Sequence, residues 1–144
     1  MAISLDEILD LGARYHHLMG IEKGDAAAQA AFFLHPNPVI FVAHAGDLTL
    51  QANHEIHKGM TDEEFFHLEP WDVTQLCDEP ERARAVGAVL WHGRSVDDEP
   101  DAIARTVVGE DWIVQRAPDG ELKFALYLNT HHQSLPGRAT FSLP

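Results

Sequence analysis

The chain has 144 residues, 45% of them hydrophobic, and a formal net charge of −13 at pH 7 when histidine is counted as neutral. A chain of this length and composition forms one domain around one core, so we predict a single domain over residues 1–144. The negative charge repels phosphate backbones and anionic lipid head groups, which excludes nucleic acid and the membrane surface as expected partners.

The cysteine content and the N-terminal residues indicate the cellular compartment. Cys77 is the single cysteine, which excludes an internal disulfide and a metal cluster held by several thiolates. The first residues contain no basic flank followed by an apolar run, and no apolar segment has the length of a membrane span. We therefore expect a cytoplasmic protein.

Two helices are predicted in the N-terminal region. Ser4 and Glu7 have the capping-box spacing, and the apolar residues after them repeat at helical intervals, which predicts a helix over residues 5–19. Asp25 is a natural N-cap for the alanine-rich segment that follows, so a second helix is predicted over residues 26–33.

A strand pair, a third helix and a run of long strands are predicted next. Residues 39–44 are β-branched and aromatic, which predicts a strand, and residues 48–53 are expected to pair with it after a bend. Thr61 and Glu64 repeat the capping-box spacing, which predicts a short helix over residues 61–68. Three or four strands separated by turn-forming residues are expected after it, over residues 71–77, 82–94, 102–116 and 121–132.

This order of elements resembles the nuclear transport factor 2-like superfamily, which includes ketosteroid isomerase-like and SnoaL-like proteins. The segments that carry the resemblance are Arg14-Tyr15 in the first helix, His57-Lys58-Gly59 before the third, and residues 112–129. The resemblance implies an α+β fold in which a curved antiparallel sheet forms a cone around N-terminal helices. It leaves the function open, because the superfamily contains enzymes as well as binding and assembly domains.

Tyr15 is the first candidate for a functional site. It shares the apolar face of the predicted first helix, so its ring is expected to point into the cone. In ketosteroid isomerase-like members, a tyrosine in a similar Arg-Tyr pair donates a hydrogen bond to a developing oxyanion, and Tyr15 matches that position. The alternative is a core tyrosine whose hydroxyl reaches a backbone carbonyl.

An acid-base enzyme also needs a base, which such members place as a carboxylate on the first strand. The predicted strand over residues 39–44 has no carboxylate there, and His44 at its end is a substitute that titrates near neutral pH. Both faces of this strand are apolar, so the alternation of its side chains does not decide which face points inward.

Glu110 and Trp112 share one face of the predicted strand over residues 102–116. If that face points inward, burial beside the indole raises the pKa of Glu110 and suits it to the role of a general acid. The alternative is a carboxylate at the rim that pairs with Arg105 or Arg116. The side chains expected to contact a ligand are those of Phe32, Phe41, Trp112 and Asn129.

The histidines do not predict a metal site. The pairs His16-His17 and His131-His132 are adjacent in sequence, and adjacent side chains diverge on a helix or a strand. His54 and His57 are three apart, but no third ligand accompanies them at a metal-binding spacing. We therefore expect neither a metal nor another cofactor.

Two classes of function agree with these features. The first is a cofactor-independent acid-base enzyme acting on a small apolar molecule as an isomerase, dehydratase, cyclase or hydrolase. Tyr15 would polarise an oxygen, and His44 or Glu110 would move the proton. The second is a non-catalytic module for ligand binding or dimerisation.

We also expect a homodimer through the exposed face of the sheet, because long strands offer more apolar surface than one layer of helices covers. The apolar side chains expected on that face are Trp91, Leu126 and Leu128.

Overall fold

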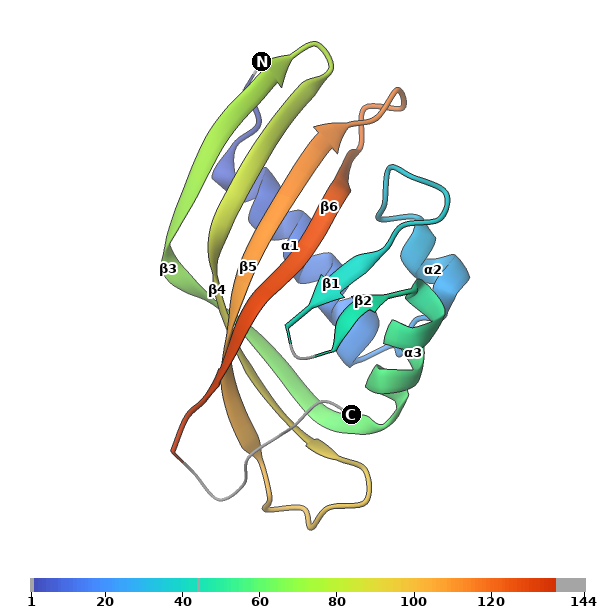
Figure 1. Ribbon diagram of the computed structural model, residues 1–144, viewed down its shortest axis with the longest axis vertical. Coiled ribbons are helices and arrows are strands. Elements are labelled where there is room, and N and C mark those ends of the chain that lie inside the picture. The colour runs from blue at the N-terminus through green and yellow to red at the C-terminus, as the bar shows by residue number, and fades with distance from the viewer. Residues whose placement is uncertain (1, 44, 137–144) are drawn as a thin grey trace.

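The computed structural model describes residues 2–43 and 45–136. These residues form an α+β domain, which confirms the predicted fold class (Figure 1). Its helices are α1 (Leu5–Gly20), α2 (Ala26–Ala30) and α3 (Leu50–Lys58). Its strands are β1 (Ile40–Val42), β2 (Gly46–Leu48), β3 (Met60–Asp78), β4 (Glu81–Ser95), β5 (Ala104–Arg116) and β6 (Leu122–Ser134).

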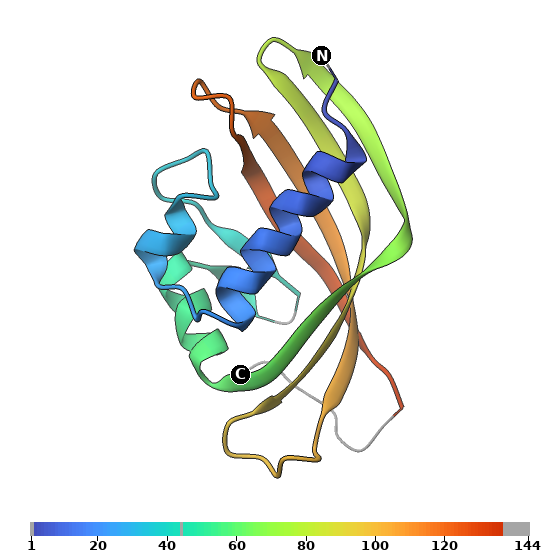
Figure 2. The ribbon, with the colours of Figure 1, turned by 180° about the vertical axis from the view of Figure 1, so that it is seen from behind.

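The described strands form one curved sheet of the order β2-β1-β6-β5-β4-β3. Neighbouring strands are antiparallel except for β1 and β6, which run parallel, so the sheet is mostly antiparallel. Shifts of register between β3 and β4 and between β5 and β6 help the long strands to bend. Helix α1 crosses the sheet on the face that curves around it (Figure 2). Helices α2 and α3 and the β1–β2 pair lie together at one side (Figure 1).

Helix α1 begins as the sequence predicted and presents one apolar face to the sheet. Its capping box is formed, because the Glu7 amide donates to Ser4 Oγ at 3.2 Å and the Ser4 amide donates to Glu7 Oε2 at 3.0 Å. Such a cap stabilises a helix by about 1 kcal/mol. Gly12 allows a close approach to the sheet, since a Cβ atom there would lie 2.6 Å from the Trp112 ring. The absence of a side chain at Gly12 therefore allows α1 to pack closely against strand β5.

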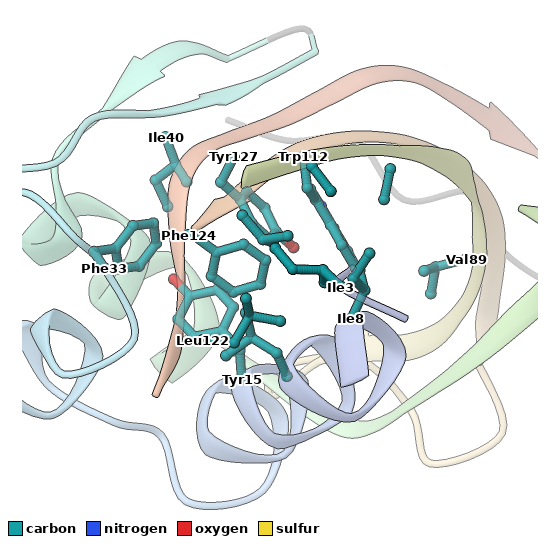
Figure 3. Packing of buried hydrophobic residues seen from close by; sticks show 14 of the residues in the cluster. Ile3, Ile8, Tyr15, Phe33, Ile40, Val89, Trp112, Leu122, Phe124 and Tyr127 are labelled. Carbon is teal, nitrogen blue, oxygen red and sulfur yellow. The ribbon is translucent and has the colours of Figure 1, made fainter. Parts of the chain in front are cut away.

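The core between α1 and the sheet contains a cluster of aromatic side chains among aliphatic ones (Figure 3). The Tyr15 ring of α1 packs edge to face against Phe124 at 5.7 Å and against Tyr127 at 5.4 Å. Trp112 stacks on Tyr127 at 5.7 Å between ring centroids and is fully buried. Each such pair contributes about 0.5–1.5 kcal/mol beyond the area that it buries. The predicted position of Tyr15, inside the curve of the sheet, is confirmed.

The third helix was predicted in the wrong place. The structure has α3 at Leu50–Lys58, where a strand was expected, and Thr49 is its N-cap, with Oγ1 accepting from the Ala52 amide at 3.1 Å. Residues 61–68, predicted as a helix, belong to strand β3 and pair with β4. A capping-box spacing is a local preference, and pairing along the whole length of β4 outweighs it.

Two elements are shorter than predicted. Helix α2 ends at Ala30, and strand β1 is confined to Ile40–Val42, with β2 directly after the bend.

Within residues 2–43 and 45–136, none of the helices has both the length and the hydropathy of a transmembrane segment.

Candidate functional site

A cavity of about 90 Å³ lies between α1, α3 and the sheet. Its wall is mostly apolar, with side chains from all of these elements, such as Met19, Ile56 and Val108. Polar side chains also line it, namely those of Tyr15, His16, Asn53, His57, Thr106, Glu110, Tyr127, Asn129 and His132. An apolar space with a few polar groups directed at it is the usual form of a small-molecule site.

Glu63 and His57 form a pair at one side of this cavity. His57, near the end of α3, has Nδ1 at 3.0 and 3.1 Å from the two carboxylate oxygens of Glu63 on β3. Lys23 Nζ donates to Glu63 Oε2 at 2.7 Å, and Trp91 Nε1 donates to Oε1 at 2.9 Å. Burial alone would raise the pKa of Glu63, but its hydrogen bonds with His57, Lys23 and Trp91 and its electrostatic interaction with His57 together lower it. Glu63 is therefore a buried carboxylate.

The backbone places Glu63 through a β-bulge. The register of β3 against β4 shifts between Thr61 and Glu64, and Asp62 inside the shift has φ +55°. The shift changes the alternation of side chains, so that Met60 and Glu63 are both buried although they are three residues apart. A non-glycine residue in this left-handed conformation costs about 1–3 kcal/mol, and such residues gather at functional sites.

Glu110 lies in the wall of the same cavity, and its carboxyl group has uncharged neighbours. Its Oε2 accepts hydrogen bonds from Trp112 Nε1 at 2.8 Å and from Asn129 Nδ2 at 2.6 Å. Burial raises the pKa of Glu110 well above its ordinary value, and the two hydrogen bonds offset only part of that rise. The alternative of a rim carboxylate was wrong, because Glu110 is buried while Arg105 contacts the Pro136 carbonyl and Arg116 pairs with Glu7.

His16 and Tyr127 form a neutral pair in the cavity wall. His16 Nε2 lies 3.1 Å from the Tyr127 hydroxyl. Burial lowers the pKa of His16 to about 3, with smaller contributions from His67 and His57, so its imidazole is neutral at physiological pH. Burial also raises the pKa of Tyr127 well above its ordinary value. This pair can exchange a hydrogen bond with a ligand but brings no charge into the cavity.

Tyr15 is held in place by side chains rather than by a backbone carbonyl. Its hydroxyl donates to Gln29 Oε1 at 2.9 Å and accepts from Asn53 Nδ2 at 3.2 Å. Gln29 in turn donates to the Leu50 carbonyl at 2.9 Å, which joins α1, α2 and α3. Burial raises the pKa of Tyr15, so the phenol stays protonated. Its hydroxyl thus has two partners in place before any ligand arrives.

The other residues expected in the site are placed as follows. Asn129 lines the cavity, whereas Trp112 lies behind the wall and supports Glu110 through its indole. Phe32 packs beneath the Arg14 guanidinium at 5.8 Å, and Phe41 is 39% exposed; among the described residues, neither lines the cavity. His44 falls outside the described residues.

The sequence does not predict the His57–Glu63 pair. His57 belongs to one of the segments that carry the family resemblance, but Glu63 lies within the helix predicted over residues 61–68. An extended reading of residues 60–78 would have placed Glu63, Phe65 and His67 on one face of a strand. The alternation of side chains along residues 60–78 therefore indicates that Glu63 shares a face with Phe65 and His67. It does not indicate the bulge at Asp62.

Comparison with known proteins identifies the fold. No family model and no curated protein matches the sequence. A scytalone dehydratase candidate from Novosphingobium aromaticivorans has a TM-score of 0.65 at 15% identity, over 94% of this chain and 90% of that one. The hexachlorocyclohexane dehydrochlorinase LinA-type3 from Novosphingobium barchaimii has a TM-score of 0.66 at 14% identity, over 96% and 94%. A ketosteroid isomerase-like protein from Erwinia carotovora atroseptica has a TM-score of 0.61 at 13% identity, over 92% and 97%.

These structural similarities cover nearly the whole of each chain. At 13–15% sequence identity they show the fold alone. The chain has the nuclear transport factor 2-like fold, as the order of its elements predicted.

Proposed function

We propose that this protein is a cofactor-independent acid-base enzyme that removes a proton from a carbon atom of a small, largely apolar molecule. The observation that supports this most is that His57, fixed by buried Glu63, lines one largely apolar cavity together with Glu110, whose pKa is raised by burial. Two of the similar proteins are named as a dehydratase and a dehydrochlorinase, and both names describe eliminations.

His57 is proposed as the base. A carboxylate at Nδ1 favours the tautomer that has its proton on Nδ1, which leaves the lone pair on Nε2. In the proposed reaction Nε2 accepts a proton from a substrate carbon, and the electron pair of that C–H bond forms a carbon–carbon double bond. Glu63 positions the ring and stabilises the imidazolium that forms.

Glu110 is proposed as the acid. In a dehydration, the C–O bond breaks with its electron pair on oxygen, and the leaving hydroxyl takes the Glu110 proton and departs as water. In an isomerisation, the proton taken by His57 is returned to a different carbon of the same molecule. Glu110 suits the role of donor because burial raises the pKa of its carboxyl group well above the ordinary value, which favours the protonated form.

The test uses uncharged one-ring ketones that carry either a β-hydroxyl group or a β,γ double bond, followed by proton NMR in deuterated water. The wild-type protein is expected to catalyse deuterium exchange and conversion of at least one class. His57→Gln is expected to lower that rate by about 100-fold or more, because it removes the base. An unchanged rate in His57→Gln would refute the proposal.

His17→Gln is the matched control, since His17 lies on α1 with a side chain that is 61% exposed. Its rate is expected to equal that of the wild-type protein. Binding of a ketone without exchange or conversion would instead favour the alternative of a non-catalytic binding module.

We also propose that two copies associate in the cytoplasm through the outer face of the sheet. Three residues that the strand register places on that face, Phe66, Val86 and Leu126, are 43%, 37% and 36% exposed. Helix α1 lies on the opposite side of the sheet (Figure 1). Leu128 shares this face by register, whereas Trp91 points inward and is buried, so its expected place on the outer face was wrong. The free thiol of Cys77 agrees with a reducing compartment.

A further inference from the structure

The carboxylate of Glu63 receives hydrogen bonds from three separate parts of the chain. Lys23 Nζ, from the connection between α1 and α2, lies 2.7 Å away. His57 Nδ1 comes from α3 at 3.0 Å, and Trp91 Nε1 comes from β4 at 2.9 Å. The Glu63 side chain is 0% exposed, and that of Lys23 is 27% exposed. Because water does not reach the carboxylate, these donors take the place of its hydration.

Lys23 and His57 differ in what they bring to this carboxylate. Lys23 brings a full positive charge, while the Trp91 indole is neutral. With Lys23 present, the negative charge of Glu63 is balanced, and His57 can hold its hydrogen bond as a neutral imidazole. If Lys23 is removed, His57 is the one side chain left in contact with Glu63, among the described residues, that can carry a positive charge. The buried carboxylate then favours the protonated form of His57.

We infer that Lys23 is a positioning residue that keeps His57 unprotonated, and so available as a base, by supplying the counter-charge of Glu63. This inference rests on the proposed function for the use of the free base. The charge state itself is a property of the protein without substrate.

The local backbone agrees with a dedicated role for Lys23. Its φ of +53° lies in the left-handed region, which a residue with a side chain rarely adopts. The next residue, Gly24, donates from its amide to the Leu18 carbonyl at 3.0 Å and accepts at its own carbonyl from Gln29 at 3.3 Å. His54 Nδ1 also lies 2.9 Å from the Gly24 carbonyl. The connection is thus tied to α1, α2 and α3 at the residue after Lys23.

Several other titratable groups lie near Lys23, His57 and Glu63. Burial keeps His16 on α1 neutral, with His67 and His57 acting on it through space. Asp62 on β3 pairs with Arg94 of β4 at 2.7 Å. The other nearby groups are the exposed pair Glu55 and Lys58 on α3, Glu64 on β3 and His132 of the cavity wall.

The test is an NMR titration of the His57 imidazole nitrogens in the full chain without ligand, with the His57 signal assigned by its loss in His57→Gln. In Lys23→Met the midpoint of the His57 titration is expected to rise by about 1 pH unit or more relative to the wild-type protein, because the Glu63 carboxylate no longer has the Lys23 cation beside it. In Lys23→Arg, which keeps the charge, it is expected to stay within a few tenths of a unit of the wild-type midpoint. An unchanged midpoint in Lys23→Met, or an equal rise in Lys23→Arg, would overturn the inference.

Two further variants keep the test decisive. If Lys23→Met does not fold, Lys23→Asn removes the charge with a residue that tolerates the left-handed conformation. In Glu63→Gln the midpoint is expected to fall below that of the wild-type protein, because the imidazolium loses its carboxylate partner, and an unchanged midpoint there would contradict a mechanism through Glu63. The titration needs no substrate, so it can fail while His57→Gln still abolishes turnover, and it can succeed while the proposed function fails.

Discussion

The protonation of Glu110 depends on burial more than on any partner. Its Oε2 accepts from Trp112 and Asn129, which are both uncharged, so neither contact compensates a negative charge. As a result its pKa lies well above the ordinary value of 4.5. A group whose pKa is raised by folding stabilises the protein fully below its unfolded pKa, and that contribution is lost as the pH rises.

We therefore predict that Glu110→Gln changes how the stability depends on pH. Glutamine keeps an acceptor oxygen for Trp112 and Asn129 but does not ionise. As the pH rises above about 4.5, the free energy of unfolding of the wild-type protein is expected to fall relative to that of the variant by about 1.4 kcal/mol per pH unit. The relative fall ends at the pKa of Glu110 in the folded protein. Urea unfolding from pH 4 to pH 9 measures this difference, and parallel curves for the two proteins would contradict the prediction.

At the scale of an element, the position of α1 depends on Gly12. Glycine inside a helix is normally less stable than alanine by about 1 kcal/mol. At this position, however, a Cβ atom would meet the fully buried Trp112 ring at 2.6 Å. The ring is also held by Glu110, so it has little freedom to move aside.

We expect Gly12→Ala to destabilise the protein by about 1–3 kcal/mol, the typical cost of overpacking a core, although helix propensity alone favours alanine. Thermal or urea unfolding measures the change. Ala13→Gly, at an exposed position of the same helix, is the control and should cost about 1 kcal/mol through propensity. A stabilised Gly12→Ala protein would show that α1 can move away from the sheet.

The elements differ in how far the sequence predicts them, and the reason is how local their determinants are. Helix α1 follows from a capping box and a regular apolar period, both contained in its own residues. Helix α3 and strand β3 do not, because the Thr61 and Glu64 pattern resembles a helix start until β4 pairs with it. The site divides in the same way. Alternation along β5 predicts that Glu110 and Trp112 are neighbours, whereas His57 meets Glu63 only through the end of α3 and the bulge at Asp62.

At the scale of the whole molecule, the sheet has one face covered by α1 and one face without a described helix (Figures 1 and 2). The uncovered face combines the apolar side chains of Val86 and Leu126 with an ion pair of Arg84 and Asp111 at 2.6 Å. Apolar side chains that surround a satisfied ion pair suit a face that a second copy can cover by two-fold symmetry.

We predict that light scattering after size exclusion, at micromolar concentration, gives twice the 16.0 kDa mass of one chain. Leu126→Glu is expected to give the mass of one chain, because two-fold symmetry brings both copies of the new carboxylate to the same buried interface. Ile21→Glu is the matched control, since Ile21 is 62% exposed at the end of α1, away from the outer face, and should leave the mass at that of two chains. A wild-type protein with the mass of one chain would refute the proposed association, and loss of the dimer in Ile21→Glu alone would move the interface to the helical side.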